Sequence, residues 1–488
     1  MSAIQETLLE RPSLGNIGRV EVGHTKMKKL QGKVVAVMGL GKSGVAAARL
    51  LYAVGSHVVL VDQKPAEELP DEVLKLKKQD MSLWTGENFT QGFEGADLVV
   101  MSPGVPMSLP AIEQVRSKGM PVIGEVELAS WFLPVPVIAV TGTNGKSTTV
   151  SLIGRILEES GHRPFIGGNL GTPLSDAALS MYEHDRLQND RPLPFSMAVV
   201  EVSSFQLESI AQFHPHIAAV LNVTPDHLDR YASVSDYTAA KGRIFEQQTT
   251  QDYAVLNMDD PQLDSFREKS LGAQIGFSTK KRVERGVYLD GDTIIATVKG
   301  KYDIVMRRED ILLPGSHNVA NVLAAVTVGI LCDCPIEFIR RAVSSFTGVG
   351  HALQIVRQRH GVMYVDDSKG TNADATVKAL ESFECPVVII LGGKNKGGDF
   401  SKLREPLAQR AKQVILIGEA TAELQRVLAG IEPMVQVQSL KEAVLMASQV
   451  ARSGDVVLLS PACASFDMFR DYRDRGEQFQ VCVNDLPE

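Results

Sequence analysis

A glycine-containing run, Thr141-Gly-Thr-Asn-Gly-Lys-Ser-Thr148, directly follows the apolar segment 137–140. A buried strand, a glycine loop and a helix start in this order are typical of a phosphate-binding loop, in which backbone N–H groups surround phosphate oxygens. The strict pattern has a glycine where Val140 stands, so this run is a shortened variant. Its lysine, Lys146, can neutralise β- and γ-phosphate oxygens, and Ser147 can ligate Mg²⁺. The run therefore predicts a strand–loop–helix unit that binds a nucleoside triphosphate.

Short apolar runs alternate with helix-like stretches along the chain, which favours α/β architecture with largely parallel sheets. The 488 residues suggest about three domains, and proline-punctuated segments at 132–136 and 346–350 mark two joints. We expect an N-terminal extension at 1–30, a Rossmann-like domain at 31–133, a P-loop-type central ATPase domain with a mostly parallel sheet at 134–346, and a Rossmann-like C-terminal domain at 347–488. The expected strands are 34–38, 58–61, 98–101, 137–140, 197–200, 217–221, 253–256, 363–365, 387–391, 414–417 and 456–459.

A second glycine loop, Gly39-x-Gly41-x-x-Gly44, follows the first expected strand and opens a helix, and Asp62 ends the next strand. This is the dinucleotide-binding fingerprint in its usual place, where glycines let backbone N–H groups approach a pyrophosphate. The loop alone favours an NAD-dependent dehydrogenase. The second interpretation is a protein that binds a UDP-sugar, which presents the same diphosphate. The third is a turn that only packs a helix against a strand. Ser102-Pro-Gly104 forms another turn at the same sheet edge. We conclude that the loop binds a diphosphate whose identity must come from other residues.

Polar side chains follow the expected strands near the phosphate loop. Glu201 ends the strand at 197–200 and Ser203 follows it, while the strand at 217–221 leads to His227. Since ligands of open α/β sheets bind outside the carboxyl ends of the strands, lysine, serine, glutamate and histidine side chains should converge at one edge. Each residue alone has a structural explanation, such as a solvated glutamate or a histidine that caps a helix. Together they predict a metal–triphosphate site.

The composition limits the partners. The net charge of −8 and the lack of a basic stripe argue against a nucleic-acid partner. Five scattered cysteines lack the spacing of a zinc site, which indicates reduced thiols in a cytoplasmic protein. No apolar run reaches the ~18 residues of a membrane span, and the first ~30 residues lack the apolar core of a signal peptide. We therefore expect a cytoplasmic monomer that acts on small molecules.

Further strings make the chain similar to a known family. They are Glu201-Val-Ser-Ser-Phe-Gln-Leu207, Asn222-Val-Thr-Pro-Asp-His-Leu-Asp229, Gly315-Ser-His-Asn-Val-Ala-Asn321, Asp367-Ser-Lys-Gly-Thr-Asn372, Leu391-Gly-Gly-Lys-Asn-Lys396, and Ser460-Pro-Ala-Cys-Ala-Ser-Phe-Asp467 with Arg475-Gly476. With the phosphate loop, they resemble the Mur ligases of bacterial cell-wall synthesis from about Val34 to the C-terminus. Within that family, the last string is most similar to the members that add D-glutamate.

The resemblance implies an ATP-dependent ligase that joins D-glutamate to UDP-N-acetylmuramoyl-L-alanine through an acyl phosphate, in peptidoglycan precursor synthesis. It implies ATP and two Mg²⁺ ions, one at Ser147 and Glu201 and the other at Glu201, His227 and a carboxylated Lys241. Glu201, His227, Lys241 and Lys146 would carry catalysis. The implied contacts are Gly142, Thr143, Asn144, Gly145, Lys146, Ser147, Thr148, Asn318, Asn321, Asp367 and Lys369 for ATP; Gly39, Gly41, Lys42, Ser43, Gly44, Asp62, Ser102, Gly104, Asn169 and Ser203 for the UDP substrate; and Thr371, Lys396, Ser465, Phe466 and Tyr472 for D-glutamate.

Ser465 is expected near a helix start, where N–H groups favour a carboxylate. The chain departs from the family's pattern at a few positions. Ala352 stands where an arginine usually follows the family's histidine, Gln354 stands where glutamate is common, and Asn395 replaces a residue that is frequently acidic. Whatever that arginine does for nucleotide phosphates must be supplied elsewhere or lost.

Proteins of other classes explain fewer of these motifs. A dehydrogenase leaves the phosphate loop unexplained, and a nucleotide-regulated binding protein would show no amino-acid-dependent phosphate release. A folylpolyglutamate synthase shares the central domain but lacks the first glycine fingerprint.

Overall fold

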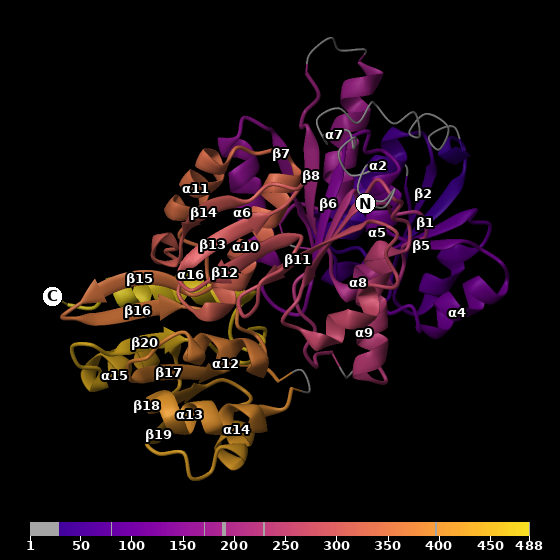
Figure 1. Cartoon of the computed structure of the whole chain (residues 1–488). Helices are drawn as coiled ribbons and strands as arrows, with labels where there is room; N and C mark the ends of the chain where they lie inside the picture. The colour runs from indigo at the N-terminus through magenta and orange to yellow at the C-terminus, as the bar shows by residue number, and fades with distance from the viewer. Residues whose placement is uncertain are drawn as a thin grey trace. The chain divides into compact units, whose positions relative to one another are not determined.

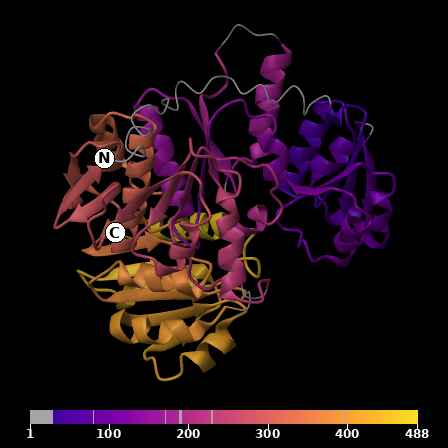
Figure 2. The same cartoon turned by 45° about the vertical axis from the view of Figure 1, so that its right-hand side comes forward.

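The computed structural model describes residues 29–79, 81–169, 171–187, 192–227, 230–395 and 398–487. The described chain is α/β and builds three sheets with helices packed against them, which confirms the predicted fold class (Figures 1 and 2). The described residues group into two compact units. Among the described residues, the first draws on the ranges 29–224, 235–308 and 321–343, and the second on 225–234, 309–320 and 344–487. Residues 1–28 of the expected extension lie outside the described part of the chain.

The first unit contains a five-stranded parallel sheet in the order β3-β2-β1-β4-β5. Its central strand, β1 (Val34–Met38), is apolar because both faces of a parallel sheet are covered. The chain passes from β1 through α2 (Lys42–Ala53) to β2 (His57–Asp62), as the Rossmann-like prediction requires. The other elements are α3 (Asp71–Lys77), β3 (Ser82–Thr85), β4 (Leu98–Met101), α4 (Pro110–Ser117), β5 (Val122–Gly124), α5 (Glu125–Ser130) and the short helices η3 (Ala66–Glu68) and η4 (Gly86–Phe93).

The first unit also contains a nine-stranded sheet in the order β14-β13-β12-β11-β10-β9-β6-β8-β7. The strands from β7 to β12 are parallel, and β13 and β14 run antiparallel to their neighbours. The strands are β6 (Val137–Thr141), β7 (Pro164–Gly168), β8 (Met197–Glu201), β9 (Ile217–Val220), β10 (Tyr253–Asn257), β11 (Ala273–Ser278), β12 (Gly286–Asp290), β13 (Thr293–Thr297) and β14 (Asp303–Arg307). The mostly parallel sheet that the sequence predicts is thus confirmed.

Helices connect these strands. They are α6 (Lys146–Glu159), α7 (Leu174–Arg186), α8 (Ser204–Leu207), α9 (Val234–Gly242), α10 (Ser316–Leu331), α11 (Ile336–Ser345) and the short η5 (Arg243–Phe245), η6 (Pro261–Phe266) and η7 (Arg308–Asp310). Two parallel strands, β6 and β8, are adjacent, so the loops that leave their carboxyl ends face each other.

The second unit holds a six-stranded sheet in the order β15-β16-β20-β17-β18-β19, parallel except for β15. Apolar side chains from helices pack against both faces, which matches the Rossmann-like expectation. Its elements are β15 (Gln354–Arg359), β16 (Val362–Asp366), α12 (Ala373–Glu381), β17 (Val387–Gly392), η8 (Phe400–Leu403), α13 (Arg404–Arg410), β18 (Ala411–Ile417), α14 (Thr421–Val427), β19 (Met434–Gln436), α15 (Leu440–Val450), β20 (Val456–Leu459) and α16 (Tyr472–Asn484).

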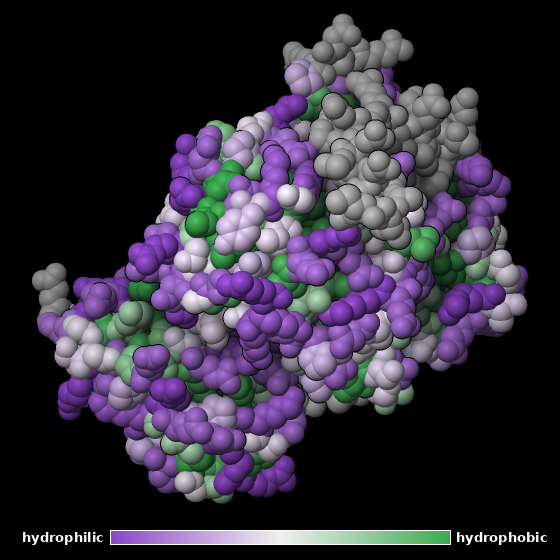
Figure 3. Space-filling view, viewed as in Figure 1, coloured by the Kyte–Doolittle hydropathy of each residue, from purple (hydrophilic) through white to green (hydrophobic). Residues whose placement is uncertain are grey.

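The molecular surface is largely polar. Hydrophilic side chains predominate on the face drawn in Figure 3, where apolar ones lie in small separate groups. None of the helices in the described ranges is both long enough and apolar enough to cross a membrane.

Candidate active site

The phosphate loop joins β6 to α6, as the sequence predicts. Gly145 is the N-cap of α6 and has a φ of +84°. A Cβ at Gly145 would lie 2.2 Å from Asn321 Oδ1, so both the backbone angle and the space call for glycine. The Lys146 Nζ donates hydrogen bonds of 2.8 Å to Gly142 O and to Thr143 O. The lysine side chain therefore folds back over the loop that it follows.

The residue after the neighbouring strand β9 fixes the shape of the phosphate loop. Asn222 O accepts a hydrogen bond from Thr143 N at 2.9 Å, and Asn222 Oδ1 accepts one from Asn144 N at 2.9 Å. The Asn222 Nδ2 in turn donates to Asn144 O at 3.1 Å. The loop is thus held in place by protein groups before any phosphate binds.

A buried carboxylate lies beside the phosphate loop. Glu201, the last residue of β8, is 3% exposed. Its Oε2 accepts a hydrogen bond of 2.5 Å from Ser147 Oγ, and its Oε1 accepts one of 2.8 Å from Asn169 Nδ2. Three residues that the sequence assigned to ATP, metal and sugar-peptide contacts thus meet around one carboxylate. Ser203 is close by in sequence and caps α8 in a reciprocal pair of hydrogen bonds with Gln206.

Lys241 is a buried lysine that points at the same loop. It lies on α9, is 1% exposed, and its Nζ donates to Gly142 O at 3.0 Å. The amine also lies 4.4 Å from the centre of the Tyr237 ring. Lys241 is therefore not a solvated lysine on a helix surface. Because Lys146 Nζ donates to the same carbonyl oxygen, two lysine amines are neighbours here.

His227 lies on the segment 225–234, which belongs to the second unit. Its backbone has a φ of +54°, and its N–H donates to Asp226 Oδ1 at 2.9 Å. The structure therefore brings Ser147, Glu201 and Asn169 together in the first unit and carries His227 on a different unit. The described ranges contain no group of three or more histidine, cysteine, aspartate or glutamate side chains arranged to hold a metal ion.

The first glycine loop is shaped by close backbone contacts. A Cβ at Gly44 would lie 1.9 Å from Gly39 O, whereas a Cβ at Gly41 would meet nothing within 4 Å. Asp62 supports the loop from the end of β2, because its Oδ2 accepts a hydrogen bond of 2.7 Å from Leu40 N. Its Oδ1 accepts from Lys64 N at 2.9 Å. Both Asp62 oxygens are thus engaged with backbone, which gives this residue a loop-holding role that the fingerprint did not predict.

The other residues assigned to the UDP substrate surround this loop or lead away from it. Ser102 follows β4 and is buried against Gly39, while Gly104 is exposed two residues later. Ser43 lies in the first turn of α2. Lys42 Nζ donates to Gly171 O at 2.5 Å, next to the segment that carries Asn169.

Asp367 is a buried carboxyl group in the second unit, directly after β16. Its Oδ2 accepts a 2.6 Å hydrogen bond from Ser460 Oγ, and its Oδ1 accepts one of 3.1 Å from Leu353 N. Burial raises the pKa of Asp367 to about 7. Lys369 and Thr371 follow in the same loop, and a backbone bond from Thr371 N to Lys369 O keeps the loop tight. Asn318 lies on α10, where its Nδ2 donates to Pro314 O at 2.7 Å.

The residues assigned to D-glutamate differ in exposure and in local structure. Ser465 is buried and Phe466 is 64% exposed. Ser465 does not precede a helix as predicted, because it begins a turn in which its carbonyl accepts from Met468 N and Phe469 N. The next helix, α16, begins only at Tyr472, since the Asp471 side chain caps it there. Lys396 lies outside the described residues.

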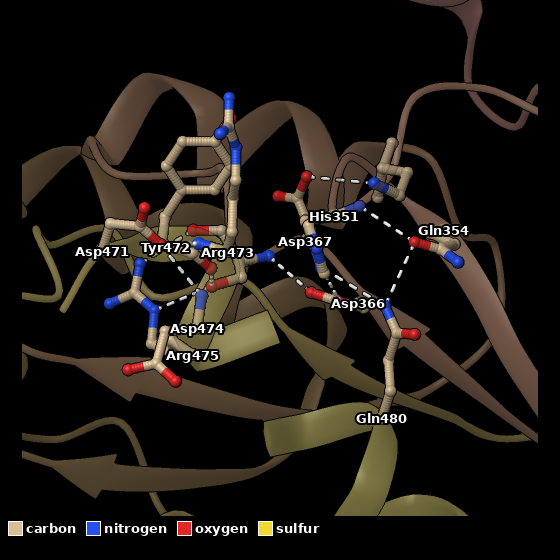
Figure 4. A network of polar contacts seen from close by, with 12 residues as sticks. His351, Gln354, Asp366, Asp367, Asp471, Tyr472, Arg473, Asp474, Arg475 and Gln480 are labelled. Carbon is tan, nitrogen blue, oxygen red and sulfur yellow. Dashed lines mark hydrogen bonds and ion pairs between the residues drawn. The ribbon is translucent and has the colours of Figure 1, made fainter. Parts of the chain in front are cut away.

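A polar network that sequence reasoning missed joins β16 to α16 (Figure 4). Asp366 Oδ2 accepts hydrogen bonds from His351 Nδ1 at 2.6 Å and from Gln480 Nε2 at 2.9 Å. Gln354 Oε1 accepts from His351 N at 3.0 Å and from Gln480 Nε2 at 3.2 Å. The hydrogen bond to Asp366 raises the pKa of His351. Two of the residues that depart from the family's pattern, Ala352 and Gln354, lie in the segment that forms this network. That departure was the sequence signal that could have pointed to the network.

Known proteins resemble the chain in each of its three sheet regions. Residues 33–124 match the model described as Mur ligase MurD-like, N-terminal domain, residues 140–329 match the Mur ligase middle domain, and residues 353–463 match the Mur ligase, glutamate ligase domain.

Full-length relatives agree with these matches. The UDP-N-acetylmuramoylalanine–D-glutamate ligase of Koribacter versatilis (strain Ellin345) is 46% identical over 460 residues, which cover 94% of this chain and 99% of the relative. The enzyme of the same name from Geobacter sp. (strain M21) is 42% identical, with 93% and 98% covered. The MurF ligase from Thermotoga maritima in complex with ADP has a TM-score of 0.55 at 17% identity over 99% of both chains, which shows the shared fold. With domain matches along its length and relatives this similar over nearly all of it, the chain belongs to the Mur ligase family.

Proposed function

We propose that the chain is an ATP-dependent ligase that joins the amine of D-glutamate to the carboxylate of UDP-N-acetylmuramoyl-L-alanine in peptidoglycan precursor synthesis. The observation that carries this proposal is the 46% identity, over 94% of the chain, to a ligase named for this reaction. The phosphate loop beside the buried Glu201 supports the use of ATP, as does membership of a family of ATP-dependent ligases.

In the first step, the L-alanyl carboxylate attacks the γ-phosphate of ATP and ADP leaves, which gives an acyl phosphate. Lys146 and the loop N–H groups stabilise the charge that spreads over the transferring phosphoryl oxygens. The Lys146 amine donates to two carbonyl oxygens of the loop, so it already lies where it can bind phosphate oxygens. The residues that we assign to the rest of ATP are Gly142, Thr143, Asn144, Gly145, Ser147, Thr148, Asn318, Asn321, Asp367 and Lys369.

We propose two Mg²⁺ ions as cofactors, which when bound would neutralise phosphate charge. A serine hydroxyl beside a buried carboxylate, as in Ser147 and Glu201, is a hard oxygen donor set that fits Mg²⁺. A lysine ammonium does not fit, since a cation repels a metal ion. Lys241 fits only as a carbamate, whose anionic oxygens are ligands of the preferred kind. His227 would complete the second set with Glu201.

The neighbourhood of Lys241 supports carboxylation of its amine. Two ammonium groups that donate to one carbonyl oxygen repel each other. A carbamate forms from a neutral amine and CO₂, and it converts the repulsion into attraction for Lys146.

In the second step, the amine of D-glutamate attacks the acyl carbon. The tetrahedral intermediate collapses with release of phosphate and leaves an amide bond. We assign D-glutamate, with its two carboxylates, to Thr371, Lys396, Ser465, Phe466 and Tyr472. Ser465 lies next to the exposed Phe466, so a substrate can reach this loop from solvent.

We assign the UDP part of the substrate to the first glycine loop and its surroundings, including Asp62, Ser102, Asn169 and Ser203. The open space at Gly41 supports a close approach of a diphosphate to the backbone. We further propose that the chain is a monomer and works in the cytoplasm, where ATP and UDP-linked precursors are available. Its domains would be bounded near residues 30, 133 and 346.

The test supplies purified protein with ATP, Mg²⁺ and UDP-N-acetylmuramoyl-L-alanine, adds one amino acid at a time, and measures phosphate release. D-glutamate should support turnover, and L-glutamate or L-alanine should not. Lys146→Ala should abolish the release, whereas Lys280→Ala, which removes an exposed lysine of the same unit, should not. Phosphate release that does not depend on D-glutamate would overturn the proposal. Oxidation of NADH or reduction of NAD⁺ by the same preparation would favour the dehydrogenase instead.

A further inference from the structure

Arg475 is a fully buried arginine at the start of α16. Its side chain has no exposed surface and is the largest fully buried side chain in the described ranges. Burial lowers its pKa to about 10, so it remains charged at neutral pH. Within the described ranges no carboxylate forms an ion pair with it. A buried charge of this kind persists only where hydrogen bonds hold it.

The guanidinium group of Arg475 binds two separate loops. Its Nε donates to Ser368 Oγ at 2.9 Å, and its Nη2 donates to Ser368 O at 2.8 Å. Its Nη1 and Nη2 both donate to Cys463 O at 3.2 Å. Ser368 Oγ in turn donates to Tyr472 O at 2.7 Å, which ties the start of α16 to the same point.

The two loops leave adjacent parallel strands, β16 and β20. The first loop, residues 366–372, carries Asp367, Lys369 and Thr371, and the second, residues 460–466, carries Ser465 and Phe466. Ser368 lies between two of the residues assigned to ATP, and Cys463 lies two positions before Ser465. Arg475 thus joins the two loops, together with the hydrogen bonds from Ser460 Oγ to Asp367 Oδ2 at 2.6 Å and from Ala462 N to Gly370 O at 2.9 Å.

No other side chain could make the same contacts. A planar guanidinium presents N–H groups in fixed directions, so it can reach Ser368 and Cys463 at once. A lysine keeps the charge but offers a single nitrogen. An apolar residue would leave buried carbonyl oxygens without donors. Since Arg475 has no exposed surface, it cannot touch a substrate and can act only through the loops that it holds.

We propose that Arg475 is a positioning residue that locks the loop 366–372 to the loop 460–466 and thereby sets the affinity for D-glutamate. This inference rests on the proposed function for the identity of the amino acid. The hydrogen-bond arrangement itself does not depend on that function.

The test uses Arg475→Lys and measures the KM values for D-glutamate, ATP and the UDP substrate. We expect the KM for D-glutamate to rise about tenfold or more, because hydrogen bonds from a charged group are lost. The KM for the UDP substrate should stay unchanged, since its assigned residues lie in the first unit. A purely structural role would lower the active fraction, and with it kcat, without this selective change.

Ser368→Ala provides a second variant in case Arg475→Lys folds poorly. It removes only the hydroxyl that joins Arg475 to Tyr472, and it should raise the KM for D-glutamate in the same direction by a smaller factor. The two substitutions should be less than additive when combined, because they break one shared contact. Arg404→Lys is the matched control, since Arg404 also donates to two backbone carbonyls, Val427 O and Ala429 O, but lies on the exposed surface. It should leave all three KM values unchanged.

Hydrogen exchange separates failure of this inference from failure of the proposed function. In Arg475→Lys, the amides of 366–372 and 460–466 should exchange faster than in the wild type, whatever the amino-acid substrate is. Unchanged exchange together with wild-type KM values would overturn the inference, as would additive effects of the two substitutions. A wild type that does not use D-glutamate would refute the function, while the exchange result would still decide the role of Arg475.

Discussion

At the scale of single residues, the carbonyl oxygen of Gly142 brings two lysine side chains together. It accepts hydrogen bonds from Lys146 Nζ at 2.8 Å and from Lys241 Nζ at 3.0 Å. The two lysines come from α6 and α9, so the contact depends on the tertiary fold. Lys241 is buried and Lys146 is partly exposed, and two ammonium groups this close repel each other; carboxylation of Lys241 would replace that repulsion by attraction.

Lys241→Ala should therefore leave the protein folded and nearly inactive. A short carboxylic acid such as acetate should restore part of the activity, because it can fill the vacated space with anionic oxygen. Gentle mass spectrometry should find the mass of CO₂ on the wild type and not on the variant. Lys280→Ala removes an exposed lysine of the same unit and serves as the control. Full activity of Lys241→Ala without added acid would show that Lys241 only packs in the protein interior and takes no part in catalysis.

The strand and glycine pattern could predict that Ser147 and Glu201 lie at the phosphate loop, whereas Asn169 and Lys241 were assigned through the family resemblance. It could not predict which of them are buried. Lys241 and Arg475 stand in polar stretches that look like solvated helix faces, and only packing against residues far away in the chain buries them. Asp62 was assigned to the substrate, but its carboxylate also binds backbone N–H groups of the loop. Ser465 was expected at a helix start, whereas Asp471 sets that start further along.

At the scale of secondary structure elements, two glycines of the first glycine loop differ in their expected roles. We expect Gly44 to be needed for the fold and Gly41 for binding of the diphosphate. A Cβ at Gly44 would lie 1.9 Å from a backbone oxygen, whereas one at Gly41 would point into open space. Gly41 has a φ of −73°, which alanine adopts easily.

Gly41→Ala should thus keep the stability of the protein and raise the KM for the UDP substrate about tenfold, since its methyl group enters the path of the diphosphate. The KM for ATP should not change. Gly44→Ala should instead lower the stability by roughly 1–3 kcal/mol, because the backbone must move. Thermal melts and steady-state kinetics of both variants check this. A rise in the KM for ATP in Gly41→Ala would reverse the assignment of the two glycine loops.

Helix α5 joins the five-stranded sheet to elements of the nine-stranded sheet through two glutamates. Glu127 Oε2 accepts hydrogen bonds from Ala211 N, Gln212 N and Phe213 N at 2.8–2.9 Å. Glu125 Oε1 accepts one from Ser175 N at 2.6 Å, at the start of α7. Burial raises the pKa of Glu125 from 4.5 to about 7.

This shift predicts a pH-dependent stability. Between about pH 4 and about pH 7, the unfolded state loses the Glu125 proton while the folded state keeps it, so the free energy of unfolding falls as pH rises. Glu125→Gln has no proton to lose. Its stability relative to the wild type should therefore increase from pH 5 to pH 8, by at most about 1.4 kcal/mol for each unit of pKa shift. Urea unfolding of both proteins measures it. Glu113→Gln, at an exposed position, should show no such trend, and parallel pH curves for Glu125→Gln would refute the burial argument.

The strands that the sequence did not predict were missed for physical reasons. The sequence predicted β1, β2, β4, β6, β8, β9, β10, β16, β17, β18 and β20, which are short apolar runs. It missed β3, β5, β11 to β15 and β19; among these, β13 and β14 are antiparallel strands near a sheet edge that can keep one face in solvent, and Ile304 of β14 is 61% exposed. It also missed the edge strand β7, which begins with Pro164 and ends in glycines.

At the scale of the whole molecule, the described chain divides into two compact units, each with its own buried apolar core. Units of this kind unfold as separate cooperative transitions unless their interface is large. The residues assigned to the UDP substrate all lie in the first unit, and those assigned to D-glutamate lie in the second. Differential scanning calorimetry should therefore resolve two transitions.

UDP-N-acetylmuramoyl-L-alanine should raise the temperature of only one transition, because a ligand stabilises the unit that binds it by about 2.7 kcal/mol at a hundred times its Kd. The same concentration should stabilise Gly41→Ala only about half as much, by about 1.4 kcal/mol, because a tenfold weaker site leaves the ligand at about ten times its Kd. Hydrogen exchange in the presence of the ligand would identify the stabilised unit as the one that contains β1 and α2. Equal shifts of both transitions, or protection confined to 344–487, would show that the substrate is bound by residues other than those of the first glycine loop.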